Sequence, residues 1–219
     1  MGREEIFAEL LQLKKDRTAL VIVDMQQGFM EEGSAMELPT AWKIVPGLQS
    51  LLTLCRKREL PVVFLEYVYS PQVPILLGEL HPEHKKPRPG AEQGFGHPSG
   101  VCLKGEENVQ TIQELKPRES ELVIRKHGYN GFFGTHLDGA LRAQKIEHLI
   151  VTGIMTDLCV LATVIGAFHH EYRLVVASDG TATLSKEIQE ISLDIMSRGY
   201  ARILTLEEIE KEIKELYGG

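Results

Sequence analysis

The 219-residue chain contains 43% hydrophobic and 25% charged residues, a balance typical of a globular protein rather than of a disordered one. Its net charge of -7, without a concentrated basic stretch, argues against a nucleic-acid partner, because a phosphate backbone needs a basic surface. The composition does not shift along the chain, so we expect residues 1–219 to form a single domain with one sizeable core.

The N-terminal segment argues against export and membrane insertion. Its sequence, MGREEIFAELLQLKKD, carries acids where a signal peptide needs positive charge, and no later stretch reaches the length of a membrane span. We therefore expect a cytoplasmic protein without membrane contact. The apolar spacing predicts an amphipathic helix within residues 1–16 that packs on the body of the protein or on a partner subunit. The residues expected on its apolar face are Ile6, Leu10, Leu11 and Leu13.

A buried strand is predicted directly after this helix. Residues 19–23 form a continuous apolar run rich in β-branched side chains, as in strands that are buried on both faces of a parallel sheet. The run ends at Asp24, and a carboxylate at the carboxyl end of a central strand lies where ligands bind in open α/β sheets. An acid that caps the following loop explains Asp24 equally well when this segment is taken by itself.

Strand and helix patterns alternate along the rest of the chain. Helices are predicted at residues 46–57, 107–115, 136–144, 158–170, 185–198 and 206–216, and strands at residues 61–67, 121–125, 147–152, 172–177 and 201–204. This alternation predicts a three-layer α/β fold, in which an open sheet of about six mostly parallel strands carries helices on both faces. No glycine-rich phosphate-binding motif follows any strand, which disfavours a nucleotide-binding version of the fold.

The stretch from residue 70 to residue 106 is rich in Pro, Gly and His and lacks periodicity. A segment of this length inside a compact domain is usually a lid or a binding loop, so we expect a cover over the site or a subunit contact. His81 and His84 fall in it, but two loop histidines without further placed ligands indicate a solvated loop rather than a metal site.

The three cysteines are odd in number and lack CxxC spacing, so they indicate neither a disulfide framework nor a thiolate metal site. Cys55 lies inside the predicted helix at residues 46–57 and is interpreted as a packing residue. Cys102 has no base nearby in the sequence and is interpreted as a bystander. Cys159 differs from both in its local context.

Cys159 lies in the turn between a predicted strand and a predicted helix. The run IVTGIMTDLCVLAT, residues 150–163, begins apolar and β-branched, passes a glycine and reaches Thr156 and Asp157, either of which can cap a helix. Cys159 would then fall in the first helical turn, where unpaired N–H groups and the helix dipole favour a thiolate. A buried, inert cysteine between helix and sheet is the alternative, and this stretch alone favours it.

A lysine ends another predicted strand. Lys126 follows residues 121–125 and precedes a loop of glycines and aromatics, HGYNGFFGT, at residues 127–135. Aromatic side chains with a few polar groups are what a small-molecule pocket needs. The alternative is a surface lysine, followed by a loop whose phenylalanines fill the core.

Three reactive groups meet at one edge of the predicted sheet. Parallel strands bring Asp24, Lys126 and Cys159 to the same carboxyl edge, provided that strands 19–23 and 147–152 are neighbours. A thiol needs a base or a nearby cation to become a thiolate, and Asp24 and Lys126 can supply these two roles. The coincidence favours catalysis over packing for Cys159. Sequence patterns do not define where the third strand lies in the sheet.

The same residues resemble the isochorismatase-like cysteine hydrolase superfamily, the relatives of nicotinamidases, N-carbamoylsarcosine amidases and ureidoacrylate amidases. The resemblance covers residues 18–206 and rests on three motifs in order, ALVIVDMQQGF, VIRKHGYNGFFGTHLD and VTGIMTDLCVLAT. It implies a Rossmann-like open α/β fold with a six-stranded sheet, and hydrolysis of small-molecule amides without a cofactor. It also implies a homo-oligomer, either a dimer or a tetramer.

The resemblance implies a role for each residue of the site. Cys159 becomes the nucleophile that forms a thioester acyl-enzyme, Asp24 the general base and later acid, and Lys126 the cation that supports the thiolate. A cis peptide bond is implied between Ile154 and Met155. The backbone N–H groups of Met155 and Cys159 would form the oxyanion hole.

Departures from the family pattern narrow these expectations. Metal-dependent nicotinamidases carry Asp-x-His after the second strand, where this chain has Glu66-Tyr67-Val68, so we expect no metal. The retained cysteine favours amide chemistry over the enol ether cleavage of isochorismatases, in which Asp24 would be the acid. Ureidoacrylate, N-carbamoylsarcosine and biuret-type compounds fit as substrates, and a binding protein that kept only the fold is the non-enzymatic alternative. The candidate substrate contacts are Phe29, Tyr129, Asn130 and Phe132.

Overall fold

A six-stranded sheet forms the centre of the computed structural model, which describes residues 3–73 and 100–218. Its strands are β1 (Thr18–Val23), β2 (Val62–Tyr67), β3 (Leu122–Lys126), β4 (His148–Ile154), β5 (Arg173–Ala182) and β6 (Ala201–Leu204). They lie in the order β3-β2-β1-β4-β5-β6, and every neighbouring pair is parallel. The predicted open parallel sheet is confirmed.

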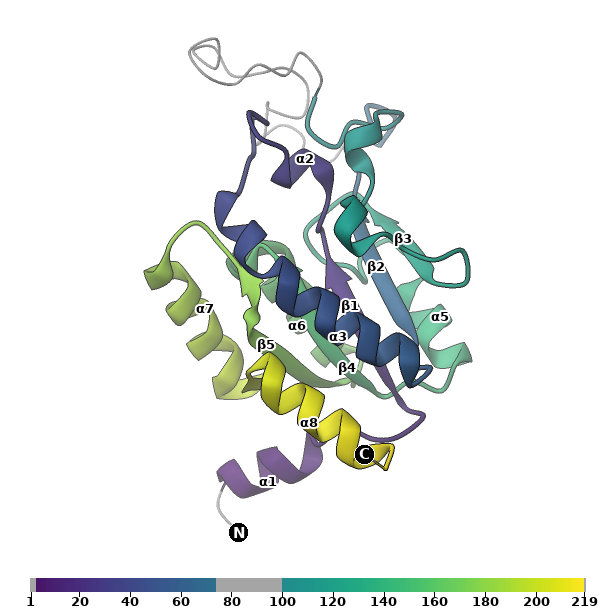
Figure 1. Ribbon diagram of the computed structural model, residues 1–219, viewed down its shortest axis with the longest axis vertical. Helices are drawn as coiled ribbons and strands as arrows, with labels where there is room; N and C mark the ends of the chain where they lie inside the picture. The colour runs from purple at the N-terminus through teal and green to yellow at the C-terminus, as the bar shows by residue number, and fades with distance from the viewer. Residues whose placement is uncertain (1–2, 74–99, 219) are drawn as a thin grey trace.

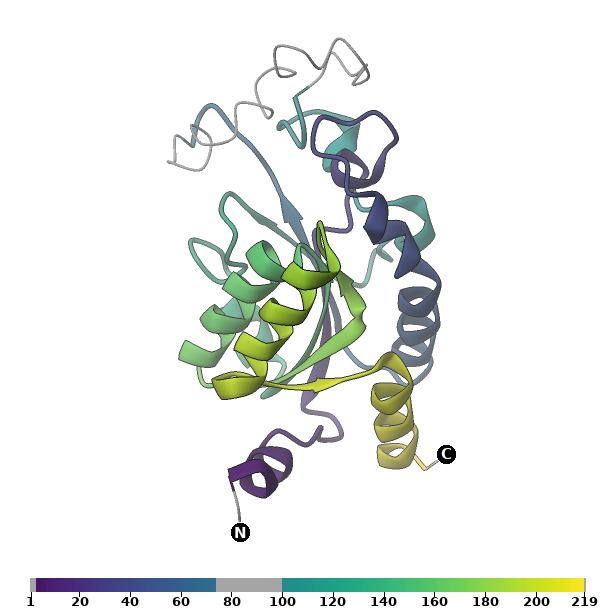
Figure 2. The same cartoon turned by 90° about the vertical axis from the view of Figure 1, so that its left-hand side faces the viewer.

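Helices cover both faces of the sheet (Figures 1 and 2). On one face lie α3 (Val45–Lys57) and α8 (Leu206–Leu216), and on the other lie α5 (Leu137–Ala143), α6 (Leu161–His169) and α7 (Lys186–Gly199). Side chains of β1 alternate between the two cores that result. Leu20 and Ile22 pack with α3 and α8, whereas Ala19 and Val21 pack with the helices of the opposite face. Both faces of β1 are therefore buried, which explains its unbroken apolar sequence.

Side-chain caps fix the starts of the last two helices, α7 and α8. The Ser185 side chain accepts a hydrogen bond from the Ile188 N–H at the start of α7. Thr205 and Glu208 form a reciprocal capping box at the start of α8, in which each side chain accepts the other residue's backbone N–H. The predicted bounds of β6 and α8 match the structure because these signals are local.

β1 and β4 are neighbours, as the predicted site requires, and their carboxyl ends approach each other closely. Val23 pairs with Gly153 in register. The φ angle of Gly153 is 103°, and a β-carbon there would lie 2.1 Å from the Val23 carbonyl oxygen. Only glycine fits this position. β3 lies at the edge of the sheet, two strands away from β1.

The N-terminal helix differs from the prediction. α1 (Arg3–Leu10) ends before the expected apolar face is complete, and its residues Ile6 and Leu10 are 40% and 55% exposed. Leu13 is buried, but it follows the helix, and its N–H donates a hydrogen bond to Glu212 of α8 at 2.7 Å. The predicted N-terminal helix is therefore present but ends earlier than its apolar spacing indicates.

The predicted helix at residues 107–115 is also wrong. Two 3-10 turns, Glu107–Val109 and Gln113–Leu115, replace it. Between them Thr111 forms an antiparallel bridge with Gln26, and its N–H and hydroxyl donate to Glu66 Oε1 at 3.0 and 3.1 Å. These long-range bonds override the local helical pattern, which contains no information about them.

The remaining segments add short elements and one extension. α2 (Gln27–Met30) and a 3-10 turn (Pro39–Lys43) follow β1, and β5 runs on to Ala182 through a register shift against β4. Of the expected lid or interface loop, residues 74–99, with His81 and His84, lie outside the described residues.

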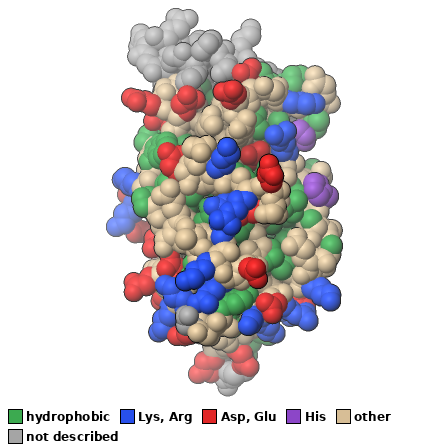
Figure 3. Space-filling model, turned by 45° about the vertical axis from the view of Figure 1, so that its right-hand side comes forward, with side chains coloured by type: hydrophobic (Ala, Val, Ile, Leu, Met, Phe, Trp, Pro, Cys, Tyr) green, Lys and Arg blue, Asp and Glu red, His purple; other side chains and the backbone are tan. Residues whose placement is uncertain are grey.

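Two observations concern the expectations that the protein binds neither nucleic acid nor a membrane. On the face shown in Figure 3, acidic and basic side chains are interspersed. Among the helices described, none is long and apolar enough to cross a membrane.

Candidate active site

Asp24 lies at the carboxyl end of β1, where the chain order across the sheet reverses between β2 and β4. Its φ angle is 51°, a left-handed conformation that aspartate adopts more readily than most residues. Its backbone N–H donates to the Leu65 carbonyl of β2 at 2.9 Å. The residue is 1% exposed, so the carboxyl group is held inside the protein rather than in a solvated loop.

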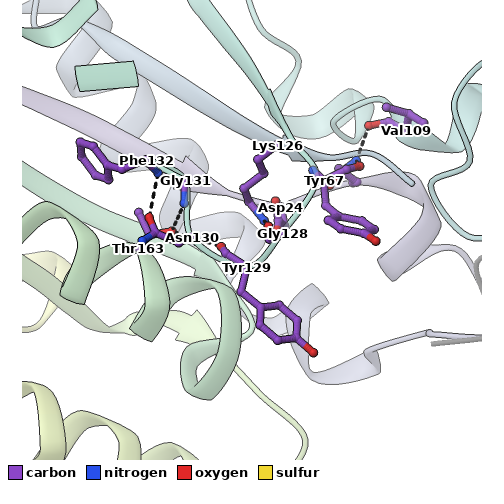
Figure 4. Close-up of polar contacts among 11 residues, drawn as sticks. Asp24, Tyr67, Val109, Lys126, Gly128, Tyr129, Asn130, Gly131, Phe132 and Thr163 are labelled. Atoms are coloured by element: carbon purple, nitrogen blue, oxygen red, sulfur yellow. Dashed lines mark hydrogen bonds and ion pairs between the residues drawn. The ribbon is translucent and has the colours of Figure 1, made fainter. Parts of the chain in front are cut away.

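Gln26 supports this strand end and was not among the predicted site residues. Its buried side chain accepts the Tyr67 N–H at 2.8 Å and donates to the carbonyl groups of Tyr67 at 2.9 Å and Val109 at 2.5 Å. The amide therefore joins the end of β2 to the segment near residue 109 (Figure 4). The sequence shows only a glutamine two residues after Asp24, and nothing in it indicates the remote partners of this side chain.

Lys126 approaches Asp24 from β3. It stands in register with Tyr67 of β2, so both side chains lie on the same face of the sheet. Its Nζ donates to Asp24 Oδ2 at 2.7 Å and to the Gly128 carbonyl at 3.1 Å, and it lies 5.5 Å from the centre of the Tyr67 ring (Figure 4). The Lys126 and Asp24 side chains are 0% and 1% exposed. The structure thus brings together two of the three predicted reactive groups as a buried ion pair.

Burial and charge oppose each other in this pair. Burial raises the pKa of the Asp24 carboxyl above its usual value, although Lys126 and the Cys159 thiol act to lower it. Burial alone would lower the pKa of Lys126, but Asp24 and Cys159 outweigh it, and this pKa is raised. Asp24 Oδ1 accepts no hydrogen bond of standard geometry from the described residues. Asp24 therefore combines a charged partner with an oxygen that is available to take a proton.

Cys159 meets the pair from a π-helical turn, Thr156–Val160, which follows β4 and continues into α6. The charges of Asp24 and Lys126 both act on its thiol. Burial, followed by the charge of Asp24, raises the pKa of the Cys159 thiol, which favours the protonated form. This shift opposes the thiolate expected from the helix end, because a helix-end effect of at most about 2 kcal/mol is smaller than the desolvation of a buried charge.

The turn is fixed by contacts other than the expected helix caps. No side chain caps its first residue. Thr156 Oγ1 donates to Gln189 Oε1 at 2.6 Å, and Gln189 Nε2 donates to the Thr181 carbonyl at 3.2 Å. Thr183 donates its hydroxyl proton to Asp157 Oδ1. Thr156 and Asp157 therefore tie the turn to α7 and to the end of β5, and Gln189 is a supporting residue that the sequence patterns missed.

A cavity of about 50 Å³ lies beside Asp24 and Cys159. Its other described lining residues are aromatic or aliphatic: Phe29, Met36, Leu38, Tyr67, Tyr129, Ile154, Met155 and Leu158. The peptide bond between Ile154 and Met155, in this wall, is cis. Because one water needs roughly 10–15 Å³ of such space, the cavity suits a group of a few heavy atoms.

Two of the four predicted substrate contacts line the cavity and two do not. Phe29 and Tyr129 are in its wall. Asn130 instead accepts the Phe132 N–H at 2.8 Å and packs on Gly166, where a β-carbon would lie 2.4 Å from the Asn130 side chain. Phe132 is buried in the core beneath α5 and α6, and its ring points away from that of Tyr129 (Figure 4). Asn130 and Phe132 instead fix the loop against α6.

The other two cysteines are buried away from solvent. Burial raises the pKa of Cys55 to about 12 and that of Cys102 well above its usual value. The Cys102 thiol donates to the Asn108 carbonyl at 3.7 Å. Both results are consistent with packing roles. Within residues 3–73 and 100–218, His, Cys, Asp and Glu side chains form no group of three or more that could hold a metal ion.

Known proteins that are similar to this chain share its fold and belong to the family that its motifs resemble. A family model described as the isochorismatase domain matches residues 18–208. The ureidoacrylate amidohydrolase RutB of Yersinia enterocolitica is 34% identical over 171 residues, which cover 75% of this chain and 74% of that protein. The N-carbamoylsarcosine amidase structure from Thermoplasma acidophilum is 29% identical, with a TM-score of 0.73 and coverage of 89% of this chain and 99% of that one.

A cysteine hydrolase structure from Pseudomonas syringae pv. phaseolicola gives a TM-score of 0.83 at 25% identity, with coverage of 94% of this chain and 96% of that one. The chain belongs to the isochorismatase family, which confirms the resemblance inferred from the three motifs. The relatives support a hydrolase that acts on carbon–nitrogen bonds.

Proposed function

We propose that the protein cleaves the carbonyl carbon–nitrogen bond of a small amide, carbamoyl or ureido compound, with Cys159 as nucleophile and Asp24 and Lys126 as its partners. The observation that carries this proposal is a buried thiol that interacts with a buried Asp–Lys ion pair beside a small cavity. A purely structural cysteine needs only apolar neighbours, and an ion pair at 0% and 1% exposure costs desolvation energy that packing alone does not require.

Acylation begins from the neutral thiol. Asp24 takes the thiol proton as Cys159 Sγ attacks the substrate carbonyl carbon, and Lys126 balances the negative charge that moves from one group to the other. The raised pKa of the Asp24 carboxyl suits this step, because it brings the proton affinities of base and thiol closer together. The new C–S bond leaves an oxyanion, which the backbone N–H groups of Met155 and Cys159 are proposed to hold.

Collapse of this intermediate breaks the C–N bond, and protonated Asp24 gives its proton to the departing nitrogen. The products of this half-reaction are ammonia or an amine and a thioester on Cys159. Water then attacks the thioester while Asp24 accepts one of its protons, the C–S bond breaks, and Asp24 returns the proton to the sulfur. One water is consumed per bond cleaved, and no redox partner is needed.

The test is release of ammonia or amine from a panel of small amides, carbamoyl compounds and ureas. We expect Cys159→Ala to abolish release and Cys55→Ala, which removes a buried sulfur in α3, to retain it. Mass spectrometry should detect an acyl group on Cys159 during turnover. Activity that survives Cys159→Ala would favour an enol ether hydrolase with Asp24 as acid, and a folded protein that releases nothing would contradict the proposal.

The pH profile tests the role of Asp24. The base acts as a carboxylate, so activity is present above its pKa and is lost as the pH falls through it. Because burial raises that pKa, the acid limb of kcat/KM should lie above the usual value of 3.8. Asp24→Asn should abolish acylation, measured as the rate of acyl-enzyme formation. An acid limb at or below pH 3.8 would contradict the assignment of Asp24 as the base.

A further inference from the structure

The cavity beside Cys159 presents an almost wholly apolar wall. Phe29 from α2, Leu38 from the segment before the Pro39–Lys43 turn and Leu158 from the π-helical turn contribute carbon surface. Tyr67 and Tyr129 add aromatic rings to this wall. A ligand in this space therefore exchanges water for hydrocarbon on most sides.

The charges around the cavity do not suit an anionic ligand. Asp24 is the one described lining residue with a charged side chain, and its charge is negative. Lys126 is absent from the described wall, and its Nζ is already bonded to Asp24 Oδ2 and the Gly128 carbonyl. The next basic residue along β3, Arg125, has a side chain that is 65% exposed and pairs with Glu66 at 3.5 Å. The described lining residues therefore offer no cation that could pair with a carboxylate on the ligand.

We infer that the preferred substrate is an uncharged amide or urea with an apolar group next to the reacting carbamoyl unit, and that the site rejects analogues in which this group carries a carboxylate. The inference rests on the proposed function and concerns the remainder of the substrate. A carboxylate in this cavity would lose its hydration without gaining a partner among the described residues, and it would also face Asp24. An apolar group gains free energy from the same burial.

The preference has a consequence for turnover. Hydrolysis of an uncharged carboxamide gives a carboxylic acid, which ionises at neutral pH and becomes the kind of ligand that this wall disfavours. Product would therefore leave readily. The similar Yersinia protein is named for ureidoacrylate, which carries a carboxylate, so the two proteins would differ in the charge of the substrate that they prefer.

Matched substrate pairs test the inference. Butyramide and succinamate present the same carbonyl on chains of equal carbon number, and propylurea and 3-ureidopropionate do so for a ureido group. Within each pair we expect kcat/KM for ammonia release to be at least about 100-fold higher for the uncharged member. Equal or higher values for the carboxylates would overturn the inference while leaving the proposed function intact. Absence of turnover for all four would instead count against the proposed function.

Alkylation of Cys159 gives a readout that does not depend on turnover. Iodoacetamide and iodoacetate differ in charge but form the same bond with sulfur, and their rates can be normalised to the rates with glutathione. Mass spectrometry of the Cys159 peptide should show at least a tenfold normalised preference for iodoacetamide. A normalised preference for iodoacetate would overturn the inference, because the cavity would then attract an anion.

A designed cation sharpens the test. Met36 lines the cavity and is only partly buried, so Met36→Arg can place a guanidinium in the wall without burying it completely. We expect it to raise the ratio of succinamate to butyramide turnover at least tenfold above the ratio found for the matched neutral variant Met36→Gln. Equal ratios in the two variants would contradict the electrostatic explanation.

Discussion

Two buried titratable groups at opposite edges of the sheet show two ways to keep such a group inside a protein. His148 begins β4 at the amino edge and is 0% exposed, and neither of its ring nitrogens has a hydrogen-bond partner in the described part of the chain. Burial, followed by the charge of Arg173, lowers its pKa to about 4, so the ring is neutral. Asp24, at the carboxyl edge, is instead paired with the buried Lys126.

The two groups differ in what their burial requires, and this difference distinguishes a structural role for His148 from a chemical role for Asp24. A neutral histidine needs no counterion, so it can be buried at the amino edge without a charged partner. A buried ion pair must desolvate two charges, and its presence at the carboxyl edge places a base and a cation next to a thiol. Chemistry is therefore expected at the edge that holds the ion pair.

The largest expected effect comes from breaking the ion pair on one side. Lys126→Met leaves Asp24 buried without its cation and should lower the free energy of unfolding by about 3–5 kcal/mol at neutral pH. The double variant Asp24→Asn/Lys126→Met removes both charges and should recover at least half of that loss. Urea unfolding measures both values.

An exposed lysine supplies the control for this prediction. The Lys186 side chain is 84% exposed and lies 3.5 Å from Glu190, so Lys186→Met should change the free energy of unfolding by no more than about 0.5 kcal/mol. If Lys126→Met were no more destabilising than Lys186→Met, the buried pair would not be held as described.

The next effect concerns the neutral group at the amino edge. Because the folded pKa of His148 is about 4 and its usual value is 6.5, its neutral form favours folding by about 3 kcal/mol. This contribution is complete above pH 6.5 and is lost as the pH falls towards 4, since the unfolded chain takes up the proton first. His148→Leu should remove this part of the pH dependence, measured by urea unfolding between pH 4 and pH 7.

The neighbours of His148 act in both directions and are unchanged in this variant. Besides Arg173, Lys14 and Arg17 lower its pKa and Glu147 raises it. His169→Leu, at an exposed position of α6, is the matched control and should retain the wild-type slope. A slope that persists in His148→Leu would show that another group titrates in this range.

The smallest expected effect tests how the nucleophile turn is held. Gln189→Ala removes the bonds from α7 to Thr156 and Thr181 and should lower kcat about tenfold, which corresponds to one or two hydrogen bonds. KM should change less than kcat, and the rate of Cys159 alkylation should fall together with kcat. Gln144→Ala alters an exposed glutamine near α5 and should leave kcat, KM and the alkylation rate unchanged. An unaltered alkylation rate in Gln189→Ala would contradict a positioning role.

The sheet and the meeting of Asp24, Lys126 and Cys159 could be predicted because they depend on local information. Short apolar runs identify buried strands, and parallel strands necessarily align their carboxyl ends. A polar residue that directly follows such a run is therefore placed at one edge without knowledge of any long-range contact. The motifs then add the order in which these strand ends occur.

Other features depend on contacts between distant segments. Asn130 looks like a ligand contact in sequence but packs on Gly166. The helical pattern at residues 107–115 is overridden by bonds from Thr111 to Glu66. The protonation of Cys159 depends on burial, and a sequence does not state how deeply a side chain is buried.

The Gln26 side chain takes the place of a backbone peptide group beside the end of β2. Where β1 turns away at Asp24, the glutamine amide offers β2 the N–H and C=O that the next residue of a strand would have offered. β2 thus continues to be paired after its neighbour has ended. The Tyr67 amide hydrogen should accordingly exchange with solvent as slowly as those within the strand, and Gln26→Ala should release it selectively. Hydrogen exchange at this single amide would then report the rigidity of one wall of the cavity.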